Sequence, residues 1–236
     1  MRETIAGRPE LTAEQRRTLA GARDPAVRTR ISLHPALTEE ERAAIDYQVG
    51  SDETFGRSDI PGWSYDPAQS ARHALSAHPL LRRRAARDPG LPPGLVERLS
   101  CDPDLGVRVL LAHNHPQAPP ALLLRSFLEH AGRERWRLTT LPGFPTEGLA
   151  AHAQAADPML RRLALLDPQT PADTVDLLSA DPDPQVRADA ARHPHLPPHR
   201  LSGLLDDEEL AHEAAAHPAL PPATMHHLLT ALDRRT

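Results

Sequence analysis

The chain has 236 residues and a formal net charge of −5, and it holds 26 prolines but only 12 glycines. Aromatic residues make up 3% and lysine is absent, so the core must be built from Leu, Ala and Val. The single cysteine, Cys101, excludes an intramolecular disulfide and a zinc site of several cysteines. The N-terminal residues lack the apolar segment of a signal peptide, and no apolar run approaches the ~18 residues of a membrane span, so we expect a cytoplasmic protein without a membrane partner.

A short motif recurs along the chain. It consists of His or Asp followed by Pro, then Thr or Pro three residues later, and Ile or Leu ten residues later. The full motif occurs at residues 33–45, 87–99, 166–178, 192–204 and 216–228, and weaker copies complete the series. The anchoring prolines are Pro9, Pro35, Pro89, Pro116, Pro142, Pro168, Pro194 and Pro218, with successive steps of 26, 54, 27, 26, 26, 26 and 24. A period near 26 residues is therefore indicated.

A second half-motif precedes each anchoring proline. Apolar residues stand four and eight positions before it, a spacing that places both columns on one face of a helix. The nearer column is Ile31, Ala85, Ala112, Leu138, Ala164, Ala190 and Ala214, and the farther column is Val27, Leu81, Leu160, Val186 and Leu210. Asp-Pro pairs at 24–25, 102–103, 157–158 and 181–182 supply a helix cap and a first helical proline. Each repeat is thus predicted to be a pair of short helices, an α-helix with a short α- or 3₁₀-helix.

Such a pair cannot bury its apolar faces alone, and stacking on neighbours merges the columns into one core. We therefore expect an all-α fold, an α-solenoid of ~26-residue repeats, rather than a disordered chain. Residues 1–49 form the first repeats, residues 50–65 an insertion or loop that lacks the columns, and residues 66–236 the main continuous array. Trp63 and Tyr65 are expected to anchor the insertion or, in the alternative, to contact a partner.

The unit DPDPQVRADAARHPHLPPHRLSGLLDD, at residues 181–207, resembles the leucine-rich repeat variant family, which is HEAT-like. The resemblance covers nearly the whole chain except residues 50–65. It implies a right-handed superhelix of alternating α- and 3₁₀-helices and no shared enzymatic activity. Some members hold an iron–sulfur centre on a cysteine cluster ahead of the repeats, and a chain with Cys101 alone cannot carry it.

Two further columns allow structural and functional interpretations. His34, His78, His115, His193 and His217 precede anchoring-type prolines where other copies have Asp88 or Asp167, which favours helix-boundary residues over metal ligands. Arginines stand seven residues before these prolines at 28, 72, 82, 135, 161 and 187, with Arg108 one residue farther away. Their guanidinium groups are expected to pair with Asp or with helix-end carbonyls, or else to form a row that binds phosphates or acidic side chains.

The central region is basic, since residues 78–137 hold 10 arginines and 6 acids, a net charge of +4. The candidate binding residues are Arg82, Arg83, Arg87, Arg108, Arg133, Arg135, Trp136, Arg137 and Arg161. An acidic protein partner is favoured. Nucleic acid is the alternative, because interleaved Arg and Trp can grip phosphates and stack on bases, while the acidic flanks argue against it.

No catalytic motif is present. The HEAAAH stretch spaces its histidines five apart and so does not match HExxH, and neither GxSxG nor a Gly-rich phosphate loop occurs. Cys101 is expected to be a small, partly buried structural residue. We predict a non-enzymatic scaffold without cofactor or metal, which binds a protein or peptide along the solenoid. An enzyme acting on nucleic acid would need a carboxylate and an aromatic residue facing the basic groove.

Overall fold

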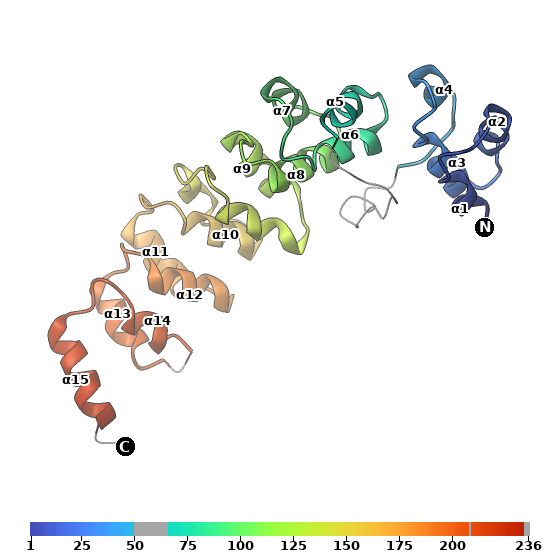
Figure 1. The fold of residues 1–236 in the computed structure, drawn as a ribbon. Coiled ribbons are helices and arrows are strands. Elements are labelled where there is room, and N and C mark those ends of the chain that lie inside the picture. The colour runs from blue at the N-terminus through green and yellow to red at the C-terminus, as the bar shows by residue number, and fades with distance from the viewer. Residues whose placement is uncertain (50–65, 208, 234–236) are drawn as a thin grey trace. The chain divides into compact units, whose positions relative to one another are not determined.

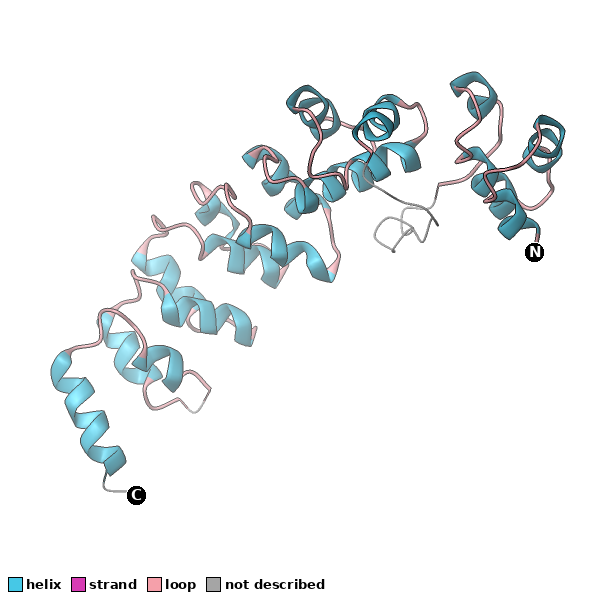
Figure 2. Ribbon diagram, in the orientation of Figure 1, coloured by secondary structure: helices cyan, strands magenta, loops and turns pink. Residues whose placement is uncertain are grey.

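A computed structural model describes residues 1–49, 66–207 and 209–233, except for the side chains of residues 133, 134, 227–229 and 231–233. Within these ranges the regular elements are helices and no strand occurs, which confirms the expected all-α class (Figure 2). The chain divides into two compact units, an N-terminal unit, Met1–Pro145, and a C-terminal unit, Thr146–Thr236. The expected insertion at residues 50–65 lies outside the described residues, and one continuous array over residues 66–236 stays a prediction.

Short helices follow one another in both units, from blue to yellow in the N-terminal unit and from yellow to red in the C-terminal unit (Figure 1). The N-terminal unit contains α1 (Arg2–Ala6), α2 (Ala13–Ala20), α3 (Pro25–Ser32), α4 (Glu39–Ala43), α5 (Pro67–Leu75), α6 (Pro79–Ala85), α7 (Pro93–Ser100), α8 (Leu105–Asn114), α9 (Pro120–Glu129) and the 3₁₀ helix η2 (Arg133–Thr140). The C-terminal unit contains the 3₁₀ helix η3 (Leu149–His152), α10 (Pro158–Ala164), α11 (Ala172–Leu178), α12 (Pro184–Arg192), α13 (Pro198–Leu204), α14 (Ala211–Ala215) and α15 (Pro222–Asp233).

One class of helix begins at a capping side chain followed by proline. The sequence predicts this start correctly at Asp24 and Asp157, whereas for the pairs at 102–103 and 181–182 the cap lies two residues later, at Asp104 and Asp183. In α12, the Asp183 carboxylate accepts hydrogen bonds from the Gln185 and Val186 amides at 2.9 and 3.1 Å, and Pro184 is the first helical residue. Proline is tolerated there because the first helical N–H has no partner within the helix. The same start occurs in α3, α5, α6 and α10, with Asp24, Asp66, His78 and Asp157 as caps.

The second class of helix begins with proline in place of a capping side chain. In α7, α9 and α13 the capping residue is Pro92, Pro119 or Pro197, and a second proline opens the helix. The fixed φ of both prolines sets the entry angle of the helix without a side-chain hydrogen bond. In α2 and α4, Thr12 and Thr38 instead form capping boxes with Gln15 and Glu41. The start of the second helix in each predicted repeat is therefore fixed by residues next to it in the sequence, either prolines or a capping threonine.

The apolar column four residues before the anchoring prolines is buried along both units. Its members Ile31, Ala85, Ala112, Leu138, Ala164, Ala190 and Ala214 are all at most 1% exposed. Of the farther column, Val27, Leu81, Val186 and Leu210 are buried, whereas Leu160 is only partly buried. Burying one Leu, Ile or Val side chain of these columns contributes about 1.5–3 kcal/mol, so the columns stabilise each unit.

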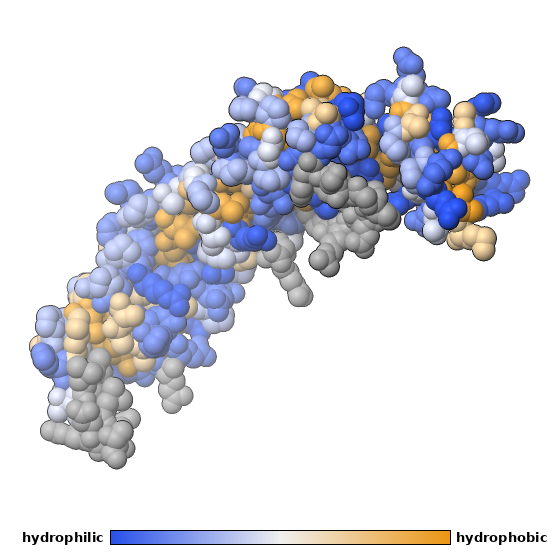
Figure 3. Space-filling model, viewed as in Figure 1, coloured by the Kyte–Doolittle hydropathy of each residue, from blue (hydrophilic) through white to orange (hydrophobic). Residues whose placement is uncertain are grey.

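The ends of the second-half helices complete these cores. In the C-terminal unit, Leu178 and Leu204 pack in one cluster with Val186 and Ala190. In the N-terminal unit, Ile45 packs with Val27 and Ile31, and Leu99 is fully buried. Hydrophilic residues cover much of the face seen in Figure 3, with apolar patches between them.

The helix types differ from the alternation of α and 3₁₀ that the family resemblance implies. The helices ahead of the anchoring prolines, such as α3, α6, α8, α10 and α12, are α-helices. Among the described residues, 3₁₀ helix occurs in η2 and η3. Pro142 contributes to the end of η2, because Leu141, the residue before it, is biased away from the α conformation and is extended.

Candidate partner-binding surface

The arginine column forms a repeated clamp. Arg82, on α6, donates through Nη1 to the carbonyls of Ser76 and Ala77 at 3.1 and 2.7 Å, in the turn just ahead of its own helix. Its Nε and Nη2 donate to the two carboxylate oxygens of Asp102 at 2.6 and 3.1 Å. The clamp therefore ties a helix boundary to the next boundary along the chain. Arg161 repeats this arrangement in full with Asp181. In Arg28, Arg108 and Arg187, Nη1 makes the same carbonyl contacts and Nη2 donates to one carboxylate oxygen of Asp46, Glu129 or Glu209.

Bidentate pairing of this kind uses most of the donors of a guanidinium group. In Arg161, Nε and Nη2 bind Asp181, and Nη1 donates to Ala155 and Ala156. These pairs raise the pKa of Arg161, and they hold the pKa of Asp181 below its ordinary value although burial alone would raise it. Three candidate binding residues, Arg82, Arg108 and Arg161, thus take part in intramolecular pairs, as the structural interpretation of the column expects.

Arg83 is also paired within the chain. It is 7% exposed, and its Nε and Nη2 donate to the Asp104 carboxylate at 2.7 and 2.8 Å. Asp104 at the same time caps α8 by accepting from the Val107 amide. Burial raises the pKa of Asp104, but the hydrogen bonds from Arg83 and Val107 outweigh it and hold that pKa below its ordinary value.

The remaining candidates divide between core and surface. Arg135 is 7% exposed, and its guanidinium carbon lies 5.1 Å from the centre of the buried Phe127 ring. Trp136 is partly buried and meets Phe127 edge-on, with ring centroids 6.0 Å apart. Arg137 is exposed and Arg87 is partly buried. The side chain of residue 133, the ninth candidate, lies outside the described side chains.

The candidate residues are divided between the two units and, within the N-terminal unit, have different partners. Arg161 belongs to the C-terminal unit and the others belong to the N-terminal unit. Within the N-terminal unit, Arg82 and Arg83 face acids that precede α8, while Arg135 and Trp136 pack on Phe127. Their role in binding stays a prediction, because the contacts found here are all with the chain itself.

The histidines before the prolines form a second repeated contact. In His193, Nδ1 accepts from the His195 amide at 3.1 Å, as an Asp cap would, and Nε2 donates to the Asp167 carbonyl at 3.2 Å. An amide N–H can only donate and a carbonyl can only accept, so these partners fix the neutral Nε2–H tautomer. The same pair of contacts recurs at His34, His115 and His217, with the Arg8, Leu91 and His193 carbonyls as acceptors.

Aspartate in the same position makes complementary contacts. Asp167 accepts from the Gln169 amide at 2.9 Å and, through its other oxygen, from the Ala150 amide at 3.3 Å. At this position before the proline, a histidine joins neighbouring segments by donating from Nε2 to a carbonyl, and an aspartate joins them by accepting from an amide. The sequence signals the cap but not the second contact, because the carbonyl partner lies about 24–26 residues upstream. In the described part of the chain, no group of three His, Cys, Asp or Glu side chains is arranged to hold a metal ion.

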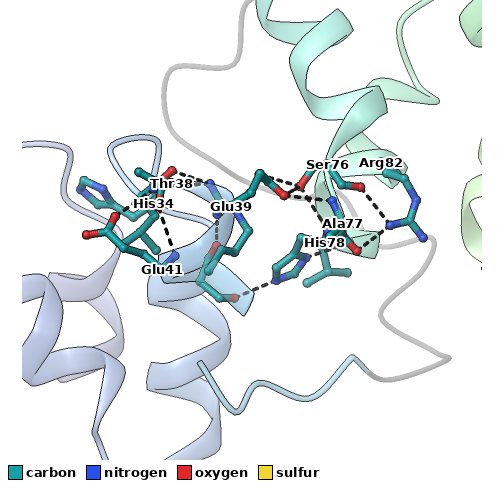
Figure 4. A network of polar contacts seen from close by, with 12 residues as sticks. His34, Thr38, Glu39, Glu41, Ser76, Ala77, His78 and Arg82 are labelled. Carbon is teal, nitrogen blue, oxygen red and sulfur yellow. Dashed lines mark hydrogen bonds and ion pairs between the residues drawn. The ribbon is translucent and has the colours of Figure 1, made fainter. Parts of the chain in front are cut away.

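A polar network joins residues on the two sides of segment 50–65 (Figure 4). The Glu39 carboxylate, from α4, accepts from the Ser76 hydroxyl and the Ala77 amide, both at 2.9 Å. His78 Nε2 lies 2.8 Å from Ser32 Oγ, and the rings of His78 and Tyr47 stack with centroids 4.0 Å apart. These contacts place α3 and α4 against the start of α6.

A pocket of about 350 Å³ lies in the N-terminal unit, and three anchoring prolines are among its lining residues. Its lining includes Pro89, Pro116, Pro142, His113, Asn114 and Leu141, and it is mainly apolar. Small-molecule and side-chain pockets start at about this size. The sequence did not predict this pocket. The signal that could have pointed to it is the spacing of 27 residues between Pro89 and Pro116, one residue more than the usual 26.

The expectation that Cys101 is partly buried is wrong. It is exposed and carries a free thiol, not partly buried as its boundary position predicts. The residue follows the last turn of α7, where the buried positions are Val96 and Leu99. Cys101 lies beyond that stripe, so its side chain faces away from the core.

Comparison with known proteins gives no match, either to a family model, to a curated protein or to a solved structure. The resemblance to the leucine-rich repeat variant family therefore stays a prediction. Over the described residues, the helices are all too short or too polar to cross a membrane.

Proposed function

We propose that the chain is a right-handed α-solenoid of ~26-residue repeats that acts as a non-catalytic cytoplasmic scaffold and binds a protein or peptide partner. The spacing of the anchoring prolines, the buried columns and the repeated arginine and histidine contacts support the solenoid. These contacts join segments about one predicted period apart, as stacked repeats require.

One observation carries the choice of partner, namely the apolar pocket bounded by Pro89, Pro116 and Pro142. Its lining offers few charges, whereas Arg82, Arg83 and Arg108 nearby in the sequence are engaged with Asp102, Asp104 and Glu129. A protein segment that inserts one apolar side chain fits such a site, because burial in a preformed pocket supplies the central contact of an interface. We propose that the pocket receives this side chain.

Selection of peptides from a random library against the full chain tests the proposal. Ala118 lines the pocket, and Ala118→Trp fills it, whereas Ala121→Trp adds the same side chain at an exposed position on α9. Selected peptides are expected to lose about tenfold or more in affinity for Ala118→Trp and to keep their affinity for Ala121→Trp. Equal binding to both variants would contradict the proposal, as would a library that yields no binder.

Nucleic acid remains the second candidate because Arg137 is exposed directly beside the partly exposed Trp136. A base stacked on Trp136 with its phosphate near Arg137 is the arrangement that single-strand binders use. Fluorescence anisotropy with single- and double-stranded oligonucleotides at ~50 mM salt tests this, since phosphate contacts are strongest at low salt. Binding that Trp136→Leu abolishes would favour nucleic acid over a peptide.

A further inference from the structure

Two histidines join successive boundary turns in the C-terminal unit, the turn between α10 and α11 and the turn between α12 and α13. His193 Nε2 lies 3.2 Å from the Asp167 carbonyl oxygen, and His195 Nδ1 lies 2.9 Å from the Thr170 carbonyl oxygen. The two imidazole rings meet edge-on, with centroids 5.5 Å apart. We refer to His193 and His195 as the histidine pair. The residues two positions after His34, His78, His115 and His217 are instead Ala36, Leu80, Gln117 and Ala219.

The hydrogen-bond partners fix the tautomers of the histidine pair. His193 Nε2 and His195 Nδ1 both face carbonyl oxygens, which only accept, so both of these nitrogens carry a proton. The other ring nitrogen of His193, Nδ1, accepts from the His195 amide at 3.1 Å. His193 therefore uses both of its nitrogens in the neutral form. A proton added to Nε2 of His195, in contrast, leaves the bond from its Nδ1 to Thr170 intact.

A second proton on His193 is incompatible with this arrangement. It would place an N–H on Nδ1, which faces the N–H of the His195 amide, and two donors do not bond. His193 is 4% exposed, so the added charge would also be buried. The Asp167 carboxylate, in the preceding turn, already accepts from the Gln169 and Ala150 amides. Protonation therefore removes a hydrogen bond and costs desolvation at once.

The groups around His193 act in the same direction on balance. Burial has the largest effect and lowers the pKa of His193; the carbonyl and carboxylate of Asp167 oppose it, while His195 and His217 lower the pKa further. The open turn therefore binds a proton more readily than the closed one, and acid favours opening. Charged side chains on α10, α12 and α14 pair with one another, Arg162 with Asp189 and Arg192 with Asp189 and Glu213.

The turn that carries the histidine pair also holds a core residue. Leu196 is 4% exposed and belongs to the core cluster that includes Val175 and Leu201. Its amide donates to the His193 carbonyl at 2.9 Å, and His217 Nε2 donates to the same carbonyl at 2.9 Å. Movement of this turn would therefore withdraw Leu196 from the core and loosen the next boundary along the chain.

We propose that the histidine pair is a pH-dependent link, in which protonation of His193 releases its turn from the preceding turn and exposes Leu196. The stability that the link contributes is complete above pH 6.5, the ordinary value for histidine, and is lost as the pH falls below it. The link lies in the C-terminal unit, so it does not depend on the pocket of the N-terminal unit or on the partner proposed for that pocket.

Hydrogen exchange of the His195 amide in the full chain tests the link. Its protection, corrected for the pH dependence of intrinsic exchange, is expected to fall about tenfold between pH 7 and pH 5. His193→Asn keeps an acceptor for this amide but does not titrate, so its protection should stay constant over the same range. His226→Asn, at an exposed position, should behave as wild type. Protection that does not fall in wild type, or that falls equally in His193→Asn, would overturn the proposal.

Nitrogen NMR of the imidazole rings supplies a readout that needs no variant to fold. At pH 7 the wild-type chain should show opposite tautomers, Nε2–H in His193 and Nδ1–H in His195. As the pH falls, protonation of His193 Nδ1 should coincide with the loss of protection at the His195 amide. The same tautomer in both rings would exclude the link. Protonation of His193 while the His195 amide stays protected would equally contradict it.

Discussion

Arg161 holds both carboxylate oxygens of Asp181, with Nε–Oδ2 at 2.7 Å and Nη2–Oδ1 at 2.8 Å. The side chain of Asp181 is 5% exposed and that of Arg161 is 14% exposed, so the pair is largely shielded from water. Asp181 also accepts from the Asp183 amide at 2.8 Å, which ties the ion pair to the start of α12. Removing the acid leaves a shielded guanidinium group without its partner, a change that is more costly than losing an exposed pair.

Asp181→Ala is expected to lower the free energy of unfolding of the C-terminal unit by about 2–4 kcal/mol. Urea unfolding followed by circular dichroism measures the change. The control is Arg192→Gln, which breaks ion pairs made by a side chain that is 56% exposed, and it should cost less than about 1 kcal/mol. Equal losses in the two variants would show that shielding does not govern these pairs.

Lowering the pH below about 6.5 is expected to destabilise the N-terminal unit through His78. Its Nδ1 must stay unprotonated to accept from the Leu80 amide. Burial first, then Arg42 and Arg84, lower the pKa of His78 from 6.5 to about 3 in the folded chain. Between these values the unfolded chain binds a proton that the folded chain does not, so this stability is complete above pH 6.5 and declines by ~1.4 kcal/mol per pH unit as the pH falls.

His78→Asn isolates this contribution, because its carboxamide oxygen still accepts from the Leu80 amide but does not titrate. Between pH 6.5 and 5 the unfolding free energy of the variant should fall less steeply, by the share of one histidine. His34, His73 and His130 of the same unit, whose pKa values burial also lowers, keep the rest of the slope. His226→Asn, at an exposed position, should leave the slope unchanged; a slope that His78→Asn does not alter would refute the role of His78.

The cap of α12 is open to a direct test. Asp183→Ala removes the acceptor for the Gln185 and Val186 amides and is expected to cost about 1 kcal/mol. Asp183→Asn should retain most of the stability because its carbonyl oxygen still accepts. Thermal unfolding of both variants measures the difference, and an Asp183→Asn loss as large as that of Asp183→Ala would show that charge, not capping, matters here.

Gly7→Ala tests the position of Arg30 without changing a charge. The added Cβ atom would meet the mobile end of Arg30 at 2.6 Å, so the guanidinium group must move. We expect a decrease in unfolding free energy of about 0.5–1 kcal/mol or less, measured by urea unfolding, because the displaced group is the end of a flexible side chain. Gly21→Ala, at the end of α2, is the matched control, and its nearest contacts are at 3.9 Å. A loss in Gly7→Ala no larger than that in Gly21→Ala would show that the position of Arg30 against α1 does not contribute to stability.

The buried columns and the helix starts are predictable from the sequence because they depend on local rules. Ala190 and Ala214 are buried, as their position before Pro194 and Pro218 predicts. For α12 the sequence predicts a cap at Asp181, but the structure has it at Asp183. Both starts are compatible with the sequence, because residues 181–184 contain two successive Asp-Pro pairs and either proline can be the first helical residue. Local patterns thus give the helix but leave its first residue ambiguous.

The features that the sequence does not reveal depend on contacts between segments. Arg82 and Arg83 look alike in the sequence, yet Arg82 pairs with Asp102 and Arg83 with Asp104. The carbonyl that receives Nε2 of His193 belongs to Asp167, and a backbone acceptor leaves no mark in the residue pattern. Partners of this kind become visible only once the helices are placed beside one another.

The arginine clamps and histidine contacts have a consequence for folding rate. Arg82 and Asp102 are 20 residues apart, and His217 and the carbonyl of His193 are 24 apart. Since each link closes only a short loop, its entropic cost stays small and does not grow when the chain lengthens. Additional copies of the motif should therefore be accommodated at either end without slowing the formation of those already present, so the length of such a chain can change in evolution by whole copies.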